Sequence, residues 1–223
     1  MKLVSLTLLA YKRPEMLIDC LKSIHETADM PFELIVNCDA RSEVEELALE
    51  LYDDNRISKL ILSNGNNRGV GRSFQNCLGM CEGDYVFKID CDVIFSPHWL
   101  STSISILDTH SDVATVNLFN YRHYKDDDLR FNIIEERKDC YIVDDFVSSC
   151  YVFRKNDFPY KLFQTVPDDG IHQKLGGKLA ITKQDYVTNQ GFGINSVYVT
   201  TEKDGTQHKT VTFDKPLTFC DSI

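Results

Sequence analysis

The chain has 223 residues, of which 43% are hydrophobic and 26% are charged. This composition is ordinary for a soluble globular protein and argues against the disordered, collagen-like and membrane-channel classes. The formal net charge of −10 disfavours non-specific binding to nucleic acid, because such binders usually carry a basic surplus. The length predicts one domain, residues 1–223, and no segment approaches the ~20 consecutive apolar residues that span a bilayer.

Eight cysteines occur in the chain, at positions 20, 38, 77, 81, 91, 140, 150 and 220. Their spacing contains no CxxC pair and no zinc-type repeat, so we expect free thiols. Ser5 and Thr7 interrupt the apolar opening segment and no small-residue cleavage site follows, which favours a buried first strand over a signal peptide. We therefore expect a cytoplasmic protein in a reducing compartment.

The first half of the chain alternates short apolar runs with segments of helical period, the pattern of βα units around a parallel sheet. In chain order this pattern predicts a strand at 4–10, a helix from Pro14, a strand at 32–37, a helix with the capping box Ser42/Glu45, a strand at 59–62, a helix from the glycine loop to Gly83, a strand at 84–89 and a helix beginning near Pro97 and Trp99. Such units place helices on both faces of one sheet, with ligands at the carboxyl ends of the strands.

Beyond residue 110 the alternation is looser. The pattern there predicts strands at 113–119 and 141–153, a short helix at 168–177, a strand at 178–182 and a β-rich tail after residue 195. We expect an α/β fold of Rossmann-like type with a mainly parallel sheet, followed by a smaller C-terminal region.

Two acids, Asp90 and Asp92, flank Cys91 directly after the predicted strand at 84–89. Such a pair is either a solvated polar turn or shares a positive partner. Mn²⁺ and Mg²⁺ take oxygen ligands, and at nucleotide sites one or two carboxylates commonly hold them. An isolated DxD is more often a turn, so the surrounding segments decide the interpretation.

Five further segments accompany the acidic pair. They are 11–17 after the first strand, Asp39 after the second, 67–71 in the glycine loop, 148–155, and Asp168-Asp169 before a predicted helix. Together with residues 83–92 they resemble the inverting glycosyltransferases of family two, which have the GT-A fold and use nucleotide sugars. The resemblance spans most of the chain.

The resemblance implies roles for particular residues. Asp92, with Asp90 nearby, would hold Mn²⁺ or Mg²⁺ and so neutralise the departing nucleoside diphosphate, and His208 is the candidate for a third metal ligand. Asp169 would accept the proton of the acceptor hydroxyl, with Asp168 as the second choice. Contacts to the donor are expected from Ala10, Tyr11, Arg13, Asp39, Asn67, Gly69, Arg72, Asp90 and Cys91.

The sequence also departs from the family pattern. Cys38 replaces one acid of the pair after the second strand, and no histidine matches around residues 189–191. Alternative roles remain open for three of the donor-binding candidates: Asp39 can cap the following helix, Tyr11 can pack at the edge of the core, and Arg72 can lie on a solvated face.

Competing functions fit the sequence less well. A nucleotidyltransferase would carry a glycine-rich loop after the first strand, and residues 69–74 lack the third glycine of a dinucleotide site. A non-catalytic nucleotide-sugar-binding module would have no need of the acids. We expect residues 1–110 to bind the donor and 111–223 to form the acceptor side, with a saccharide, a glycoconjugate or, as a minority hypothesis, a modified nucleic-acid base as acceptor. The aromatic and basic residues at 151–163 can stack on that acceptor or pack on the sheet.

Overall fold

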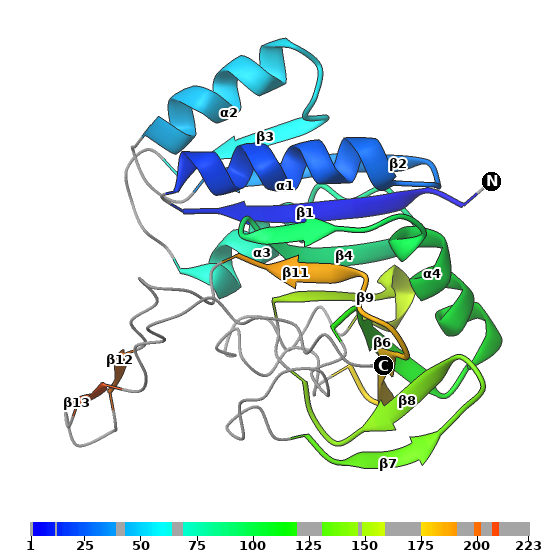
Figure 1. The fold of residues 1–223 in the computed structure, drawn as a ribbon. Helices are drawn as coiled ribbons and strands as arrows, with labels where there is room; N and C mark the ends of the chain where they lie inside the picture. Colours follow the sequence, from blue (N-terminus) through cyan, green and yellow to red (C-terminus); the bar gives the residue numbers. More distant parts are fainter. Residues whose placement is uncertain are drawn as a thin grey trace.

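A central sheet organises the computed structural model, which describes residues 2–11, 13–38, 43–63, 69–119, 131–146, 149–158, 175–190, 199–201 and 207–209. Within these ranges the main sheet has nine strands in the order β3-β2-β1-β4-β9-β6-β10-β8-β7 (Figure 1). Its first four strands are parallel neighbours: β1 (Val4–Ala10), β2 (Phe32–Cys38), β3 (Lys59–Leu62) and β4 (Tyr85–Asp90). The predicted α/β fold with parallel βα units is therefore confirmed.

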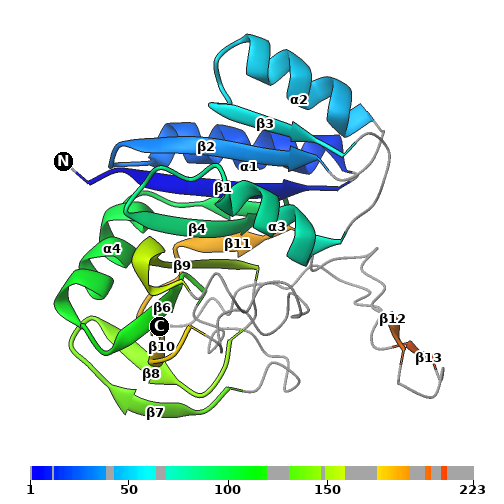
Figure 2. The ribbon, with the colours of Figure 1, turned by 180° about the vertical axis from the view of Figure 1, so that it is seen from behind.

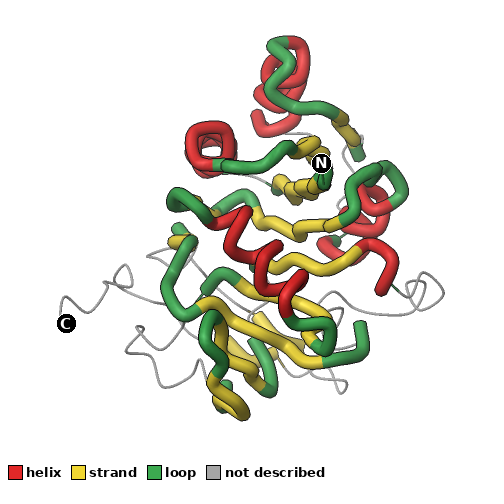
Figure 3. The backbone as a smooth tube through the Cα atoms, turned by 90° about the vertical axis from the view of Figure 1, so that its right-hand side faces the viewer, coloured by secondary structure: helices red, strands yellow, loops and turns green. Residues whose placement is uncertain are grey.

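Helices cover both faces of this sheet, as the short connections predicted. One core cluster joins the sheet to α1 (Pro14–Thr27), α2 (Glu43–Asp53) and α4 (Trp99–Thr109), and a second joins it to α3 (Val70–Leu78). Figure 2, seen from behind, shows α3 in front of β1 and β4, and Figure 3 shows helices on either side of the sheet. Because both faces are covered, all seven residues of β1 are buried.

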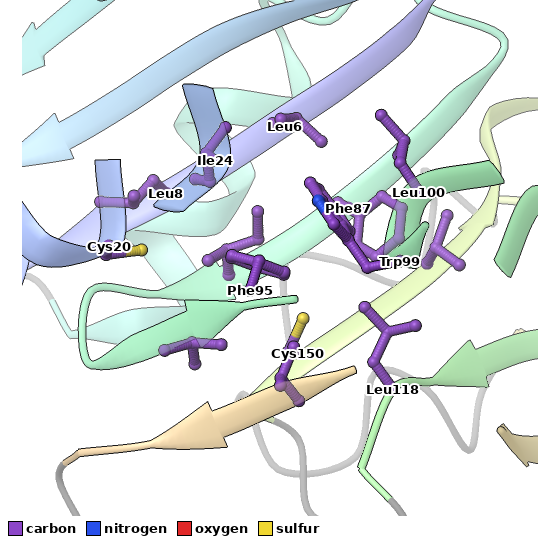
Figure 4. Close-up of a cluster of buried hydrophobic side chains, with 14 of the residues drawn as sticks. Leu6, Leu8, Cys20, Ile24, Phe87, Phe95, Trp99, Leu100, Leu118 and Cys150 are labelled. Carbon is purple, nitrogen blue, oxygen red and sulfur yellow. The ribbon is translucent and has the colours of Figure 1, made fainter. Parts of the chain in front are cut away.

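The larger core cluster fixes where α4 begins. Trp99, the second residue after Pro97, is fully buried with its ring 5.0 Å from Phe87 and 4.1 Å from Phe95, measured between centroids (Figure 4). Asp29 accepts hydrogen bonds from the backbone N–H and the hydroxyl of Ser101, and so supplies the helix cap from another loop. Trp99 is thus an anchor of the core.

The second half of the sheet is mixed. Strand β9 (Cys150–Arg154) is antiparallel to both β4 and β6 (Val113–Asn117), while β10 (Lys178–Thr182) is parallel to β6. An antiparallel pair, β7 (Ile133–Glu136) and β8 (Cys140–Val143), completes the sheet. Two small sheets pair β5 (Val93–Phe95) with β11 (Val187–Asn189) and β12 (Val199–Thr201) with β13 (Gln207–Lys209).

Three sequence-based boundaries are wrong. The predicted strand at 141–153 is two strands, β8 and β9, because the chain bends at Asp144, whose carboxylate accepts bonds from the backbone and side chain of Asn132 beyond the end of the β7–β8 pair. Helix α3 ends at Leu78 rather than Gly83. Residues 175–177 are not helical, since Gly176 and Gly177 have φ of +67° and +116°; the rest of the predicted helix, 168–174, lies outside the described residues.

Two further observations bear on the sequence predictions. The seven described cysteines are all free and buried, as expected from their spacing. No helix in the described part of the chain is both long and apolar enough to cross a membrane.

Candidate functional site

The carboxyl ends of β1, β2 and β4 meet at one edge of the sheet. Register places Ala10 opposite Cys38 and Leu9 opposite Asp90, so the last residues of the three strands are neighbours. Asp90 closes β4 and Asp92 lies in the turn to β5. The predicted acidic pair therefore occupies the edge at which sheets of this kind bind ligands.

Asp90 is held firmly on one side. Its backbone N–H donates to the carbonyl of Ser149 at 2.9 Å, and its Oδ1 accepts a hydrogen bond from Lys88 Nζ at 2.6 Å. The Lys88 side chain is 2% exposed, whereas that of Asp90 is 31% exposed. The ammonium of this ion pair is therefore buried in the sheet, and the carboxylate is partly exposed at the edge of the sheet.

Asp92 is a carboxylate in a largely dry position. Its side chain is 20% exposed, and its Oδ2 lies 3.8 Å from Nη1 of Arg13. Burial raises the pKa of Asp92 to about 6; the charge of Asp90 adds to the rise, and Arg13 and Lys88 oppose it. Its backbone carbonyl accepts from Gln190 N–H at 2.7 Å, which fixes the turn to the end of β11. A divalent cation would relieve the cost of keeping this acid charged.

The loop from β1 to α1 supplies Tyr11 and Arg13. Arg13 has φ of +58° and immediately precedes Pro14 at the start of α1; its carbonyl accepts the backbone N–H of Met16 and of Leu17. Tyr11 is 41% exposed, so it is not the core-edge aromatic considered as an alternative. The helix start thus brings a guanidinium to Asp92 and leaves an aromatic ring near the surface.

Cys91 is more deeply buried than its acidic neighbours. It belongs to the larger core cluster, its thiol accepts a hydrogen bond from the Tyr11 backbone N–H, and burial raises its pKa to about 11. A neutral thiol in this place packs in the core and so stabilises the turn at residues 91–92. Any contact of Cys91 with a donor would come from its backbone.

Gly69 and Arg72 lie at the start of α3. Gly69 is exposed with φ of +77°, no atom lies within 4 Å of where a Cβ would be, and its carbonyl accepts the backbone N–H of Ser73. Arg72 is exposed on the first turn. The open backbone at Gly69 is compatible with close approach of a ligand.

The remaining predicted site residues cannot be placed beside the acidic pair. Asp39, Asn67, Asp168 and Asp169 lie outside the described residues, and His208 lies in β13, of whose side chains the structure describes nothing. The assignments of the base, the third metal ligand and these donor contacts stay predictions.

The aromatic residues considered for acceptor binding pack on the sheet. Tyr151, Phe153 and Phe158 are buried in the α3-side core cluster, and the ring of Phe74 packs edge-on against Tyr151 and Phe153 at 6.4 and 6.3 Å. Of the two roles considered, stacking on an acceptor or packing on the sheet, these three side chains therefore have the second.

A second group of possible metal ligands lies elsewhere. His110, Asp139 and Cys140 have ligand atoms within 4.8 Å of one another. The carbonyl of His110 accepts a bond from Arg154, which pairs with Tyr85 at the beginning of β4, so this group is a strand length from Asp90. A hydrogen bond of 2.8 Å between His110 and Asp139 accounts for their proximity.

Sequence reasoning missed Lys88 and Gln190. Lys88 did carry a signal, because it is a charged residue inside the otherwise apolar run Tyr85–Ile89. Gln190 carried none, since its backbone contact with Asp92 depends on tertiary pairing of β11 with β5.

Comparisons with known proteins identify the family and the fold of the chain. The model of Glycosyl transferase family 2 matches residues 5–162. No curated protein matches the chain. Among solved structures, residues 1–349 of TarS from S. aureus give a TM-score of 0.63 at 15% identity, covering 86% of this chain and 61% of that one.

Two further similar structures also contain ligands. GalNAc-T7 with UDP, GalNAc and Mn²⁺ gives a TM-score of 0.63 at 11% identity, covering 81% of this chain and 42% of that one. The mannosyltransferase PcManGT from Pyrobaculum calidifontis, with GDP-Man and Mn²⁺, gives 0.58 at 16% identity, covering 82% and 58%. The chain therefore spans less than two thirds of each of these three proteins. At such identities the likeness shows the fold, and the predicted GT-A fold is confirmed.

Proposed function

Because the chain belongs to glycosyl transferase family 2, we propose that it moves a hexose or pentose from a nucleotide diphosphate sugar to an acceptor hydroxyl, with inversion and with Mn²⁺ or Mg²⁺ bound. The observation that carries this proposal is Asp92, a mostly buried carboxylate with a raised pKa, next to Asp90 at the carboxyl edge of the sheet.

The acidic pair fits a hard divalent cation. Both groups are oxygen donors, and the buried carboxylate of Asp92 is costly to ionise without a positive partner. When bound, the cation supplies neutralisation of the charge that grows on the leaving diphosphate. Asp92 is the proposed principal ligand, with Asp90 beside it and His208 as the proposed third.

The similar structures support a nucleotide-sugar donor. TarS was solved with UDP and with UDP-GlcNAc, GalNAc-T7 with UDP, GalNAc and Mn²⁺, and PcManGT with GDP-Man and Mn²⁺. These ligands share a nucleoside diphosphate and differ in base and sugar. We therefore propose for this chain only that it binds a nucleoside diphosphate group and a divalent cation.

The described residues have clear tasks in such a reaction. Tyr11 offers an exposed ring to stack on the base, and Arg13 places a positive charge near the pyrophosphate. Gly69 and Arg72 would contact phosphate or ribose at the start of α3. These groups bind and orient the donor in the half formed by residues 1–110.

Asp169 is the proposed base, with Asp168 as the second choice. A carboxylate on the far face of the sugar would remove the acceptor proton as the hydroxyl attacks, which inverts the anomeric centre. We propose a saccharide or glycoconjugate as the acceptor, bound by the half formed by residues 111–223.

A thermal-shift panel of UDP and GDP sugars, with and without Mn²⁺, tests donor binding, because a ligand that binds the folded state raises its stability. We expect at least one nucleotide sugar to raise the melting temperature only when Mn²⁺ is present. Asp92→Ala should abolish that shift, and Asp54→Ala, at an exposed acid beyond α2, should keep it. No shift with any member of the panel would contradict the proposal.

Release of nucleoside diphosphate on addition of saccharide acceptors then tests the transfer step. Asp169→Asn is expected to keep the metal-dependent thermal shift and lose the release of product. Turnover near that of the natural chain in this variant would show that another group is the base.

A further inference from the structure

Lys88 is a charged residue in the interior of the sheet. It lies in β4, and register places Thr7 of β1 and Tyr151 of β9 on either side of it. Its side chain is 2% exposed, and its neighbours along the strand, Phe87 and Ile89, are fully buried. An ammonium in such a place is stable only when it is paired and hydrogen-bonded.

The ion pair of Lys88 links this interior to the candidate site. Lys88 and Asp90 are two apart on one strand, so both side chains project from the same face, and Nζ lies 2.6 Å from Oδ1. Other lysine pairs in the described residues, such as Lys2 with Asp108 and Lys183 with Glu136, are partly exposed at both ends. The Lys88 pair differs because only its acid reaches the surface.

This geometry suits Asp90 and Asp92 to different roles. One oxygen of Asp90 is committed to the ammonium, which also repels a divalent cation, while the carboxylate keeps its other oxygen for a hydroxyl donor. Asp92 is the cation ligand of the proposed function; its side chain is 20% exposed and its Oδ2 lies 3.8 Å from Nη1 of Arg13.

We propose that Lys88 is a positioning residue, which holds the Asp90 carboxylate in place at the carboxyl edge of the sheet. The inference rests on the proposed function for the roles of the two acids, with Asp90 as the acceptor for a hydroxyl of the nucleotide sugar and Asp92 as the cation ligand. A solely stabilising pair explains the arrangement less well, because replacing a buried ion pair with apolar residues is often neutral or stabilising.

The central test is Lys88→Met, which keeps an unbranched side chain, one atom shorter, and removes its charge. Mn²⁺ affinity, measured by titration without donor, is expected to rise about threefold to tenfold, because a nearby positive charge is lost. With a nucleotide sugar and Mn²⁺, KM is expected to rise and kcat to fall, each by about tenfold, because Asp90 is no longer held in place. Weaker or unchanged Mn²⁺ binding, or unchanged kinetic constants, would overturn the inference.

A double-mutant cycle separates positioning from general damage. In an Asp90→Asn background, Lys88→Met should change kcat and KM by less than about twofold, since the residue through which it acts is already altered. An equal loss in both backgrounds would overturn the inference. The double variant removes both charges and so remains informative should Lys88→Met alone fail to fold.

Lys59→Met is the matched control. Lys59 pairs with Glu33 and Glu82 at the start of β3, away from the acidic pair, so its loss should lower the melting temperature and leave Mn²⁺ affinity and kinetic constants unchanged. Absence of any transfer by the natural chain would refute the proposed function, whereas the Mn²⁺ titration still tests Lys88.

Discussion

Replacing Asp92 with asparagine is expected to stabilise the metal-free protein at pH 8. The change keeps the shape of the side chain and removes a charge that the fold holds in a mostly dry position. Because Asp92 has a raised pKa in the folded chain, its contribution to stability is fully present below its ordinary pKa of 3.8 and is lost as pH rises through about 6. Asparagine does not titrate and does not incur this loss.

The size of the effect follows from the two pKa values. A rise from 3.8 to about 6 corresponds to about 3 kcal/mol, at roughly 1.4 kcal/mol for each pH unit. The side chain is 20% exposed, so solvent screening reduces the expected gain to about 2 kcal/mol. For a chain of this length that gain corresponds to a rise in melting temperature of about 4–8 °C.

Thermal unfolding in EDTA at pH 4 and pH 8 provides the measurement. Asp92→Asn should melt higher than the natural chain at pH 8 and within about 1 °C of it at pH 4. Asp54→Asn, at an exposed acid, should change neither value by more than about 1 °C. A gain of the same size at both pH values, or a loss at pH 8, would refute the electrostatic explanation.

Two other predictions concern the amino-terminal edge of the sheet, opposite the site, and urea unfolding measures both. Gly83→Ala should cost about 2–4 kcal/mol, because its Cβ would lie 2.7 Å from backbone atoms near the start of β1, whereas Gly79→Ala, with a nearest contact of 3.5 Å, should cost less than about 0.5 kcal/mol. Glu33→Gln should cost about 1–3 kcal/mol, since Oε2 of the buried carboxylate accepts a bond from Lys59 that an amide nitrogen cannot accept, whereas the amide oxygen can keep the bonds that Oε1 accepts from Ser5 and two backbone N–H groups. Glu82→Gln, at a side chain that is 72% exposed, should change stability by less than about 0.5 kcal/mol.

The parallel half of the sheet is visible in the sequence because most residues of its strands are apolar. The strands predicted at 4–10 and 59–62 coincide with β1, which is fully buried, and with β3, which is partly buried at the edge of the sheet. The same property hides the break between β8 and β9, since both strands are mostly buried and the bend at Asp144 lies beside Asn132, twelve residues earlier in the chain. Strand β5 has three residues and forms against β11, far along the chain, so no local pattern could predict it.

The candidate site was predictable where residues follow directly from strand ends. Asp90 and Asp92 lie at the carboxyl edge because β4 ends there, and Arg13 lies nearby because Pro14 begins α1. Alternation along β4 also indicates that Cys91 and Asp90 project from opposite faces, and Cys91 belongs to the core cluster. The pairing of Lys88 with Asp90 could not be read from the sequence, because a lysine between apolar residues is also compatible with an edge strand.

The charges of the four described groups at this edge balance one another. Asp90 and Asp92 contribute two negative charges at neutral pH, and Lys88 and Arg13 contribute two positive ones at 2.6 and 3.8 Å. The summed charge of these four groups therefore does not attract a diphosphate. A bound divalent cation would make that sum positive, and a positive site attracts the negatively charged diphosphate. Cation and nucleotide should therefore each raise the affinity of the site for the other by the same factor, as thermodynamic linkage requires. Such reciprocity would make the site respond to the metal-bound donor rather than to free cation or free nucleotide.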